Sequence, residues 1–518
     1  MNGYELAAFI LYFVIVIAIG IYFFIKSKNE SEKDYFLGGK SMNGLVAALS
    51  AGASDMSAWV LMGLPGSIYL YGMGQVWISV GLAIGTVLAW VFVAPRLRVY
   101  SSLAGDSITI PQFLTNRFFS KKSTLRVVCA IVFVIAYCVY TASSISACGE
   151  LFNTLTGGAI SQKVGMIIAA CIIVLYTMLG GFRAVCWTDF IQGLLMLAAL
   201  MILPLIALGF VKAGKTPDVF VPWTENNENF YNLLSSGKFN WQSISDILTG
   251  LAWGLGYFGM PHILVRYMSI KNKKEMRKSQ VIGSSWTIVI LIMASVLGIV
   301  AHEYLGAANA EMKNQVFVSI ARSIFSYGAL AFIGGLLISA IVAASMSTAD
   351  SQLLASSGAF ASDLYKTSIR KDASDKEMML VSRIVVVVVA VIALLIALFG
   401  NSGIMALVSA AWSIFGASFG PAIILALYWK RFNYKGCVAG IISGFVLSVL
   451  WMVLFNFEYY GFTSIIKYTN LYELLPGFII GLLTAIIVSL ATEKPSDETV
   501  KMFEEMVNSD ELDYSKKA

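Results

Sequence analysis

The segment Leu49–Gly66, LSAGASDMSAWVLMGLPG, is the part of this chain that indicates its fold most directly. It lies within a longer apolar run, 44–71, yet it carries a carboxylate at Asp55 and a helix-breaking Gly-Leu-Pro-Gly sequence at 63–66. Small residues and hydroxyl groups surround the acid. Backbone that is not helical is tolerated at membrane depth only where it is buried in protein or lines a cavity. The stretch therefore predicts a broken membrane helix whose free carbonyl groups face the interior of a helix bundle.

The composition of the 518-residue chain supports a membrane protein. Apolar residues make up 58% without counting the 44 glycines, and charged residues make up 13%, whereas soluble chains are about 45–50% apolar and about 25% charged. This excludes an ordinary soluble enzyme, a nucleic-acid-binding protein and a disordered chain. The apolar runs are continuous rather than alternating, which excludes an outer-membrane barrel. We expect an all-α polytopic protein surrounded by membrane lipid, with no nucleic acid and no obligate protein as partner.

Thirteen apolar segments are expected to form membrane spans. They lie near residues 5–25, 44–71, 75–95, 127–149, 165–180, 187–211, 244–265, 280–301, 328–362, 384–399, 403–428, 437–455 and 474–492. They predict a single integral membrane domain over 1–518. Its parts are 1–43 (first span and cytoplasmic loop), 44–212 (spans 2–6), 213–242 (outer loop), 243–430 (spans 7–11), 431–492 (spans 12–13) and 493–518 (cytoplasmic tail).

The distribution of basic residues predicts the orientation. With thirteen spans the two termini face opposite sides. Of the 36 Lys and Arg residues, 29 lie in the C-terminal tail and in loops that follow odd-numbered spans, and 7 lie in the other loops. The positive-inside rule then places the N-terminus outside and the C-terminus in the cytoplasm of a cell whose plasma membrane holds the chain. By these boundaries no Lys or Arg lies within a span, and Arg266 belongs to a cytoplasmic loop.

Asp55 is the main indication of a functional site. It lies about 11 residues into the second span, which at about 1.5 Å per residue is about 16 Å deep. An acid near the bilayer midplane is costly and marks function by default. With no basic residue in the spans, a cation from solution is the expected partner, and the surrounding carbonyls and hydroxyls are the oxygen ligands that sodium prefers. The alternative is a protonated or hydrogen-bonded structural Asp55.

A second break is predicted in the seventh span, at Gly250–Pro261, GLAWGLGYFGMP. It comes five spans after the first break. Two interrupted spans at corresponding positions of two halves indicate an inverted-repeat transporter, with spans 2–6 and 7–11 as the repeats. Taken alone, glycine-rich spans indicate close helix packing, and only the five-span spacing favours the repeat.

Polar residues of the ninth span and one acid of the sixth extend the predicted site. Ser347, Thr348, Asp350 and Ser351 form a hydroxyl-rich stripe with one carboxylate in an otherwise apolar helix, which favours a cation site toward the cytoplasmic half. Asp189 stands near the cytoplasmic start of the sixth span. It is either a helix-capping carboxylate or a partner of Asp350 on the ion's exit path. No intramembrane base is expected to neutralise these two acids.

These motifs resemble those of the sodium:solute symporter family and, within it, the bacterial sodium/proline symporters. The resemblance covers most of the chain and implies thirteen spans with a LeuT-type five-plus-five inverted repeat. It is carried by Leu49–Gly66 (LSAGASDMSAWVLMGLPG), Tyr176–Gln192 (YTMLGGFRAVCWTDFIQ), Trp253–Leu264 (WGLGYFGMPHIL) and Met346–Leu354 (MSTADSQLL).

The resemblance implies which residues bind the ions and the solute. For sodium, with lithium as an alternative coupling ion, the implied residues are Ala53, Met56, Ala344, Ser347, Thr348 and the acid Asp55. For proline and its outer gate they are Ser57, Trp59, Tyr140, Trp253, Tyr257 and Pro261. Some members bind a second sodium deeper in, for which the corresponding residues here are Asp189, Ser347 and Ser351, with Asp350 as an added acid. The chain departs from the expected pattern at Ala58, where glycine is usual, and at Ala349-Asp350, so one sodium per solute is not assured.

The expected function is sodium-coupled symport of L-proline, and the chain is not expected to be an enzyme. The same machinery with another solute, such as another amino acid, pantothenate or a sugar, is the first alternative. An ion channel or sensor without solute coupling is the second, although no ring of repeated groups indicates a pore. An intramembrane enzyme lacks a recognisable nucleophile, metal site or acid pair.

Overall fold

The chain folds as a bundle of helices in the computed structural model, which describes residues 1–26, 32–179, 181–216, 229–306 and 312–512. No strand occurs in these ranges, apart from one isolated bridge between Met42 and Ile270. The α-helices up to the second break are α1 (Gly3–Lys26), α2 (Glu32–Leu37), α3 (Gly44–Asp55), α4 (Leu64–Tyr71), α5 (Val76–Leu88), α6 (Ala94–Leu103), α7 (Ile110–Arg117), α8 (Thr124–Leu155), α9 (Gln162–Leu179), α10 (Phe182–Lys212) and α11 (Trp241–Ala252). The later ones are α12 (Pro261–Ser269), α13 (Lys273–Leu305), α14 (Val316–Ile324), α15 (Leu330–Gly358), α16 (Asp375–Phe399), α17 (Ile404–Tyr428), α18 (Tyr434–Phe455), α19 (Leu474–Ala491) and α20 (Asp497–Val507).

Tighter or wider helical turns join several of these helices. The 3₁₀ segments are η1 (Gly38–Lys40), η3 (Met73–Gln75), η5 (Trp253–Phe258) and η8 (Phe457–Tyr460), and the π segments are η2 (Trp59–Gly63), η4 (Ala89–Val93) and η7 (Ala359–Ile369). Segments η2 and η5 lie at the two predicted breaks.

The number of clear membrane spans is smaller than the thirteen expected. Within the described residues, ten helices are long and apolar enough to cross a membrane, and the bent pair Gly44–Asp55 and Trp59–Tyr71 makes eleven. The remaining two expected spans correspond to α9, which is shorter, and to α11, η5 and α12, which are interrupted. The all-helical polytopic architecture is therefore confirmed, while the exact count is not. Residues 217–228 of the predicted outer loop lie outside the described residues.

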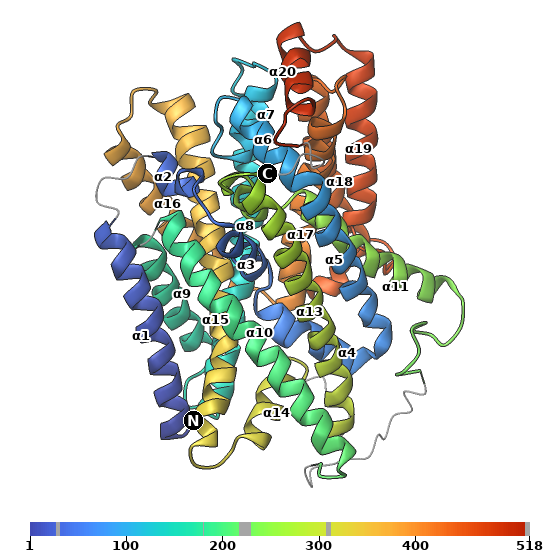
Figure 1. Ribbon diagram of the computed structural model, residues 1–518. Coiled ribbons are helices and arrows are strands. Elements are labelled where there is room, and N and C mark those ends of the chain that lie inside the picture. The colour runs from blue at the N-terminus through green and yellow to red at the C-terminus, as the bar shows by residue number, and fades with distance from the viewer. Residues whose placement is uncertain (27–31, 180, 217–228, 307–311, 513–518) are drawn as a thin grey trace.

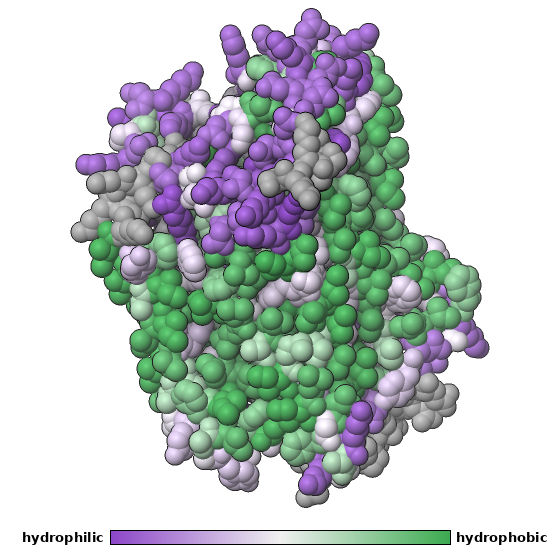
Figure 2. Space-filling model, in the orientation of Figure 1, coloured by the Kyte–Doolittle hydropathy of each residue, from purple (hydrophilic) through white to green (hydrophobic). Residues whose placement is uncertain are grey.

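The surface fits a protein embedded in a bilayer. A broad band of hydrophobic residues surrounds the middle of the molecule, and hydrophilic residues gather mainly at one end (Figure 2). That end carries α2, α6, α7 and α20, whereas α14 and the N-terminal end of α1 lie at the other (Figure 1). Helix α17 is central, because 94% of its apolar stretch is buried, against 22% for α18.

Both predicted breaks are present. Helix α3 ends at Asp55, and the helix that resumes at Trp59 is bent from it by 61°. In the second break, α11 passes into η5 and then into α12, which begins with Pro261. Glycine is required there, because a Cβ on Gly256 would lie 1.9 Å from the indole nitrogen of Trp412. The two breaks therefore lie in the packed interior, as the sequence predicts.

The C-terminal tail forms a short helix, α20. Its buried residues are Thr499, Met502, Phe503 and Met506, whereas Val507 is exposed. The ring of Phe503 contacts that of Tyr100 on α6. The tail helix is therefore packed on the bundle.

Candidate functional site

Asp55 joins the two breaks. Its side chain is 1% exposed, and its Oδ2 atom accepts a hydrogen bond of 2.5 Å from the Tyr257 hydroxyl in η5. Its Oδ1 atom has no hydrogen-bond partner among the described residues. The backbone carbonyl of Asp55 accepts bonds of 3.3 Å from the Trp59 indole nitrogen and the Tyr140 hydroxyl. A buried carboxylate oxygen without a partner is costly, so this geometry provides an open ligand for a cation.

Three of the residues predicted to bind sodium, Ala53, Ala344 and Ser347, meet where α3 contacts α15. The Ser347 Oγ atom lies 2.8 Å from the Ala53 carbonyl and 3.1 Å from the Ala344 carbonyl, as a donor to either. The Thr348 hydroxyl is fully buried, with no partner among the described residues. Met56 comes directly after Asp55 in the chain, and its amide donates to the Gly52 carbonyl at 2.8 Å. Carbonyl and hydroxyl oxygens of this kind suit a hard cation.

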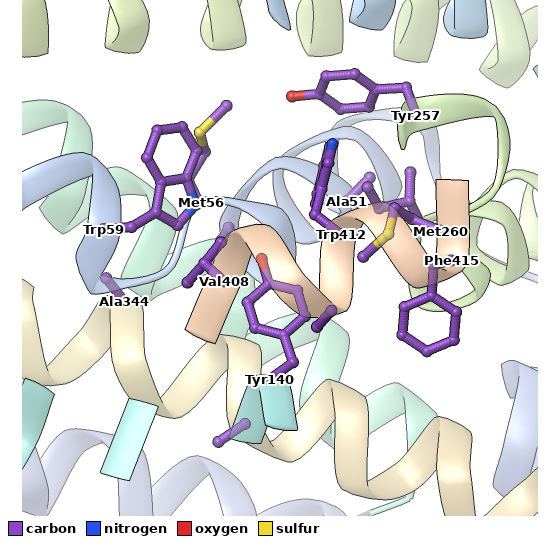
Figure 3. Packing of buried hydrophobic residues seen from close by; sticks show 14 of the residues in the cluster. Ala51, Met56, Trp59, Tyr140, Tyr257, Met260, Ala344, Val408, Trp412 and Phe415 are labelled. Atoms are coloured by element: carbon purple, nitrogen blue, oxygen red, sulfur yellow. The ribbon is translucent and has the colours of Figure 1, made fainter. Parts of the chain in front are cut away.

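Aromatic side chains predicted to contact the solute lie beside this region. The ring centres of Trp59 and Trp253 are 6.2 Å apart. Trp412 on α17 completes the group, with its ring 6.3 Å from that of Trp253 and 5.4 Å from that of Tyr257. Figure 3 shows Trp59, Tyr140, Tyr257 and Trp412 around the broken helices. Such aromatic walls suit a small, largely apolar solute.

The other two predicted solute residues are also buried at the breaks. Ser57 is 1% exposed and lies between α3 and η2. Its Oγ atom is 3.4 Å from the Trp59 amide, which donates to it. Pro261 begins α12 and is buried.

A large cavity reaches this aromatic group from one end of the molecule. It has a volume of about 490 Å³, and both Trp253 and Tyr472 line it. We call it the entrance cavity; its wall includes the turn between α4 and α5, on the side of the molecule where the chain begins. On the other side of the breaks, a cavity of about 30 Å³ is lined by Pro261, Arg266 and Ser351 among others. The second cavity is too small for anything larger than a few waters.

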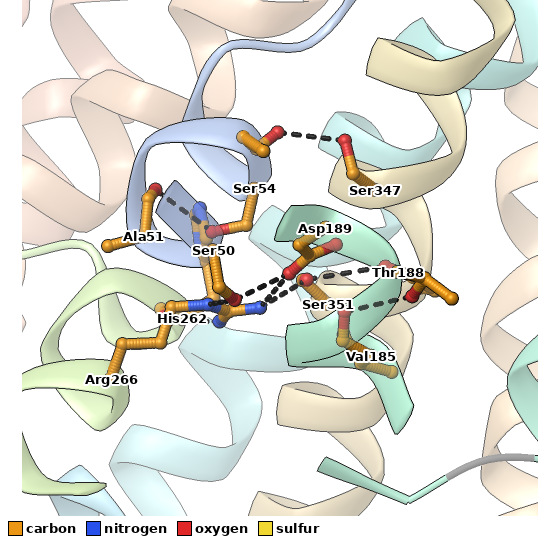
Figure 4. Close-up of polar contacts among 12 residues, drawn as sticks. Ser50, Ala51, Ser54, Val185, Thr188, Asp189, His262, Arg266, Ser347 and Ser351 are labelled. Carbon is orange, nitrogen blue, oxygen red and sulfur yellow. Dashed lines mark hydrogen bonds and ion pairs between the residues drawn. The ribbon is translucent and has the colours of Figure 1, made fainter. Parts of the chain in front are cut away.

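Arg266 corrects the expectation that no base lies within the spans. It is the sixth residue of α12 and is 2% exposed. Its Nη2 atom lies 2.8 Å from Asp189 Oδ2 and donates to Ser351 Oγ at 2.6 Å. Its Nε atom donates to Ser50 Oγ at 2.7 Å, and that hydroxyl donates in turn to Asp189 Oδ2 at 2.7 Å. Figure 4 shows the guanidinium between these side chains.

The structure therefore brings the residues of the predicted second sodium site together, but around a guanidinium. Asp189 is not a helix cap, because α10 begins at Phe182. Asp350 on α15 is fully buried. Its Oδ1 accepts a bond of 3.3 Å from Ser351, while its Oδ2 has no partner in the described part of the chain.

Sequence reasoning missed three groups, namely Arg266, Trp412 and Tyr472. Arg266 stands directly after HILV, so the continuing helical pattern of PHILVRYMS was the available signal. Trp412 and Tyr472 lie far along the chain from the breaks. Only the packing places them there, through the ring contacts of both with Trp253.

With this geometry established, comparison with known proteins identifies the family. The family model for the sodium:solute symporter family matches residues 35–444. The chain belongs to the sodium:solute symporter family. Its relatives include the osmoregulated proline transporter OpuE of Bacillus subtilis, which is 39% identical over 95% of this chain and 96% of that protein. This sodium:solute symporter is thus related to transporters, and it is not an enzyme.

Two further relatives carry similar names. The high-affinity proline transporter PutP of Bacillus subtilis is 39% identical, over 93% of this chain and 97% of its own length. Sodium/proline symporter 2 of Staphylococcus saprophyticus is 38% identical over 94% of this chain and 92% of its own length.

Solved structures share the fold. An outward-open, substrate-bound Na⁺-coupled sialic acid symporter superposes with a TM-score of 0.74 at 18% identity, over 96% of this chain and 99% of that one. MhsT in complex with L-phenylalanine gives a TM-score of 0.53 at 14% identity, over 86% of this chain and 98% of that one. At these identities the likeness concerns the fold alone.

Proposed function

We propose that this symporter imports L-proline across the plasma membrane, driven by the inward flow of sodium. One observation carries the proposal: the buried, partly unpaired Asp55 stands beside an aromatic group, in a chain 39% identical to proline transporters over nearly its whole length. A small apolar imino acid fits aromatic walls. Its charged ends fit the helix ends and ring faces that the two breaks present.

The proposed sodium ligands are the Ala53, Met56 and Ala344 carbonyls and the Ser347 and Thr348 hydroxyls, with Asp55 Oδ1 supplying charge. Ser347 already joins α3 to α15 through the Ala53 carbonyl, so an ion among these oxygens would hold the two helices together. The Tyr257–Asp55 bond gives the ion a direct connection to the solute's aromatic group. Linkage requires that each ligand then raise the other's affinity by the same factor. Lithium, with the same preference for oxygen, is the proposed alternative ion.

The second proposed sodium site lies at Asp189, Asp350 and Ser351. Two carboxylates and one guanidinium leave one negative charge uncompensated when both acids are ionised, and Asp189 Oδ1 and Asp350 Oδ2 are buried without partners among the described residues. A sodium ion on its way to the cytoplasm would balance that charge.

The proposed topology is thirteen spans with a five-plus-five inverted repeat, the N-terminus outside and the C-terminus in the cytoplasm. The domain divisions follow the ranges given by the sequence, with repeats at 44–212 and 243–430. In this orientation the entrance cavity faces outside and the small cavity near Arg266 marks the closed exit. Rocking of the repeats would then open the exit and close the entrance.

Uptake by proteoliposomes tests the proposal. Labelled L-proline is added outside while an inward gradient of sodium, lithium or protons is imposed separately, with choline as the control cation. We expect accumulation with sodium, weaker accumulation with lithium, and none with choline. Accumulation of a sugar or pantothenate instead of proline would show that proline is the wrong solute. Sodium flux without solute would favour the channel.

A further inference from the structure

The segment 456–473, which joins α18 to α19, covers the inner end of the entrance cavity. It contributes Asn456, Tyr460, Tyr472 and Glu473 among others to the cavity wall. Asp55, Tyr257 and Trp412 do not line that cavity, whereas Trp253 and Tyr472 do. These two rings therefore separate the entrance cavity from the first break.

Tyr472 lies directly on the solute's aromatic group. Its ring stacks on Trp253 with centres 5.1 Å apart and planes 24° apart. Its hydroxyl donates to the Ser409 carbonyl of α17 at 2.7 Å, and its amide donates to the Thr249 hydroxyl of α11 at 3.1 Å. The ring is 6% exposed. It thus stands with Trp253 at the boundary between the entrance cavity and the first break.

The same segment is attached to the first half of the second broken helix. The Thr249 hydroxyl donates to the Asn470 carbonyl at 2.8 Å, and the Asn470 side chain donates to Asp246 on α11. Any rotation of α11 therefore acts directly on the position of Tyr472.

Glu473 closes the segment on itself. Its side chain is 1% exposed. One carboxylate oxygen accepts from the Tyr460 hydroxyl and the other accepts from the Asn456 amide at 2.9 Å. In the described part of the chain Glu473 has no ion pair. Its carboxylate instead accepts hydrogen bonds from these two neutral donors, which lie near the start of the segment. A hydrogen bond to a charged acceptor is stronger than a neutral one, which suits a fixed anchor.

We infer that the segment 456–473 is the outer gate of the solute site, with Tyr472 as the gating side chain and Glu473 as the residue that positions it. The inference rests on the proposed function. Tyr472 leaves Trp253 to admit the solute and returns to cover it. Its attachment to both α11 and α17 couples this movement to the second break.

The test measures the dissociation of labelled proline from purified protein in saturating sodium, together with the number of sites and the uptake kinetics. Tyr472→Ala should speed dissociation and raise the half-saturating proline concentration, each by about tenfold, because it removes an aromatic contact, while the number of sites stays unchanged. Tyr472→Phe keeps the ring and should change dissociation by about threefold or less. Tyr71→Ala, which removes another tyrosine from the cavity wall, is the matched control and should dissociate like wild type.

The Glu473→Gln variant tests whether Glu473 positions Tyr472 or only stabilises the fold. It keeps the shape of the side chain but weakens its acceptor oxygens, so it should speed proline dissociation about threefold with unchanged sites. The double variant with Tyr472→Ala should be no faster than Tyr472→Ala alone. If Glu473→Gln instead lowers the number of sites with normal dissociation from those remaining, its positioning role is wrong. If Tyr472→Ala dissociates like Tyr71→Ala in a protein that transports proline, the gate is wrong. Failure of wild-type uptake would overturn the proposed function instead.

Discussion

Asp55 and Asp189 are both buried acids, but Asp55 lies at the first break whereas Asp189 lies within the continuous helix α10, and their surroundings differ. The Asp55 carboxylate accepts one hydrogen bond from the Tyr257 hydroxyl, and its other oxygen has no partner among the described residues. Asp189 is neutralised by Arg266 and also accepts from Ser50. Burying an acid with a base produces a fixed joint, whereas burying it without one leaves a position that a mobile cation can fill. Asp55 is thus left with ion binding alone, whereas Asp189 combines a structural ion pair with Arg266 and a place at the proposed second sodium site.

The largest expected effect comes from removing the base. Arg266→Ala leaves Asp189 charged and unpaired in the interior, which should lower the free energy of unfolding by about 3–5 kcal/mol. Thermal unfolding in detergent, followed by size-exclusion chromatography, measures the loss. The double variant Asp189→Asn with Arg266→Gln removes both charges and should recover most of the stability. A stable Arg266→Ala protein would show that the pair is not a structural joint.

Asp55→Asn should give the next largest effect, on transport rather than on folding. Losing the charged ligand should raise the sodium concentration for half-maximal uptake by roughly ten- to a hundredfold, corresponding to about 1.5–3 kcal/mol, while the thermal stability stays near wild type. Sodium-dependent uptake and thermal unfolding of the same preparation provide both readouts. Wild-type sodium dependence would contradict the assignment of the ion to this acid.

Hydroxyl ligands should contribute less than the acid. Ser347→Ala and Thr348→Ala each remove one neutral oxygen, so each should raise half-saturating sodium by a factor of about 2–10, from about 0.5–1.5 kcal/mol. Proline affinity at saturating sodium should change little. Ser345→Ala is the matched control, because that hydroxyl bonds to the Ile341 carbonyl of its own helix. If Ser347→Ala and Thr348→Ala show the same sodium dependence of uptake as the control Ser345→Ala, α15 does not line the ion site.

Asp350→Ser should have the smallest effect, and it tests the proposed second sodium site beside Asp189. It removes the charge that the guanidinium does not balance, so we expect proline uptake to persist with lower cooperativity in sodium. Initial uptake against sodium, with choline holding the osmolality constant, gives the Hill coefficient. Superimposable curves would remove the second sodium site and leave Asp350 as a buried partner of Ser351.

The sequence predicted the breaks well because they depend on local chemistry. The placement of Gly and Pro around Asp55 and before Pro261 marks both interruptions, and the structure has them at these residues. The all-helical bundle follows from the long apolar runs for the same reason. The exact span count did not follow, because α9 is short and α12 is partly polar.

What the sequence missed depends on contacts between distant segments. A window that measures only hydrophobicity ends the seventh span before Arg266, since an unpaired guanidinium opposes insertion. The structure extends the helix past it because Asp189, in the other predicted repeat, supplies the counter-charge. Trp412 and Tyr472 carry no local signal at all. Their role follows only from stacking against Trp253.

The Asp189–Arg266 pair also has a consequence for how the protein is made. Its two members are separated by 77 residues of sequence. At a synthesis rate of about 5–20 residues per second, Asp189 is made roughly 4–15 seconds before Arg266. During that interval the growing chain must hold α10 at the insertion machinery or accept it with a neutral acid. The synthesis of α12 therefore supplies the charge that neutralises Asp189.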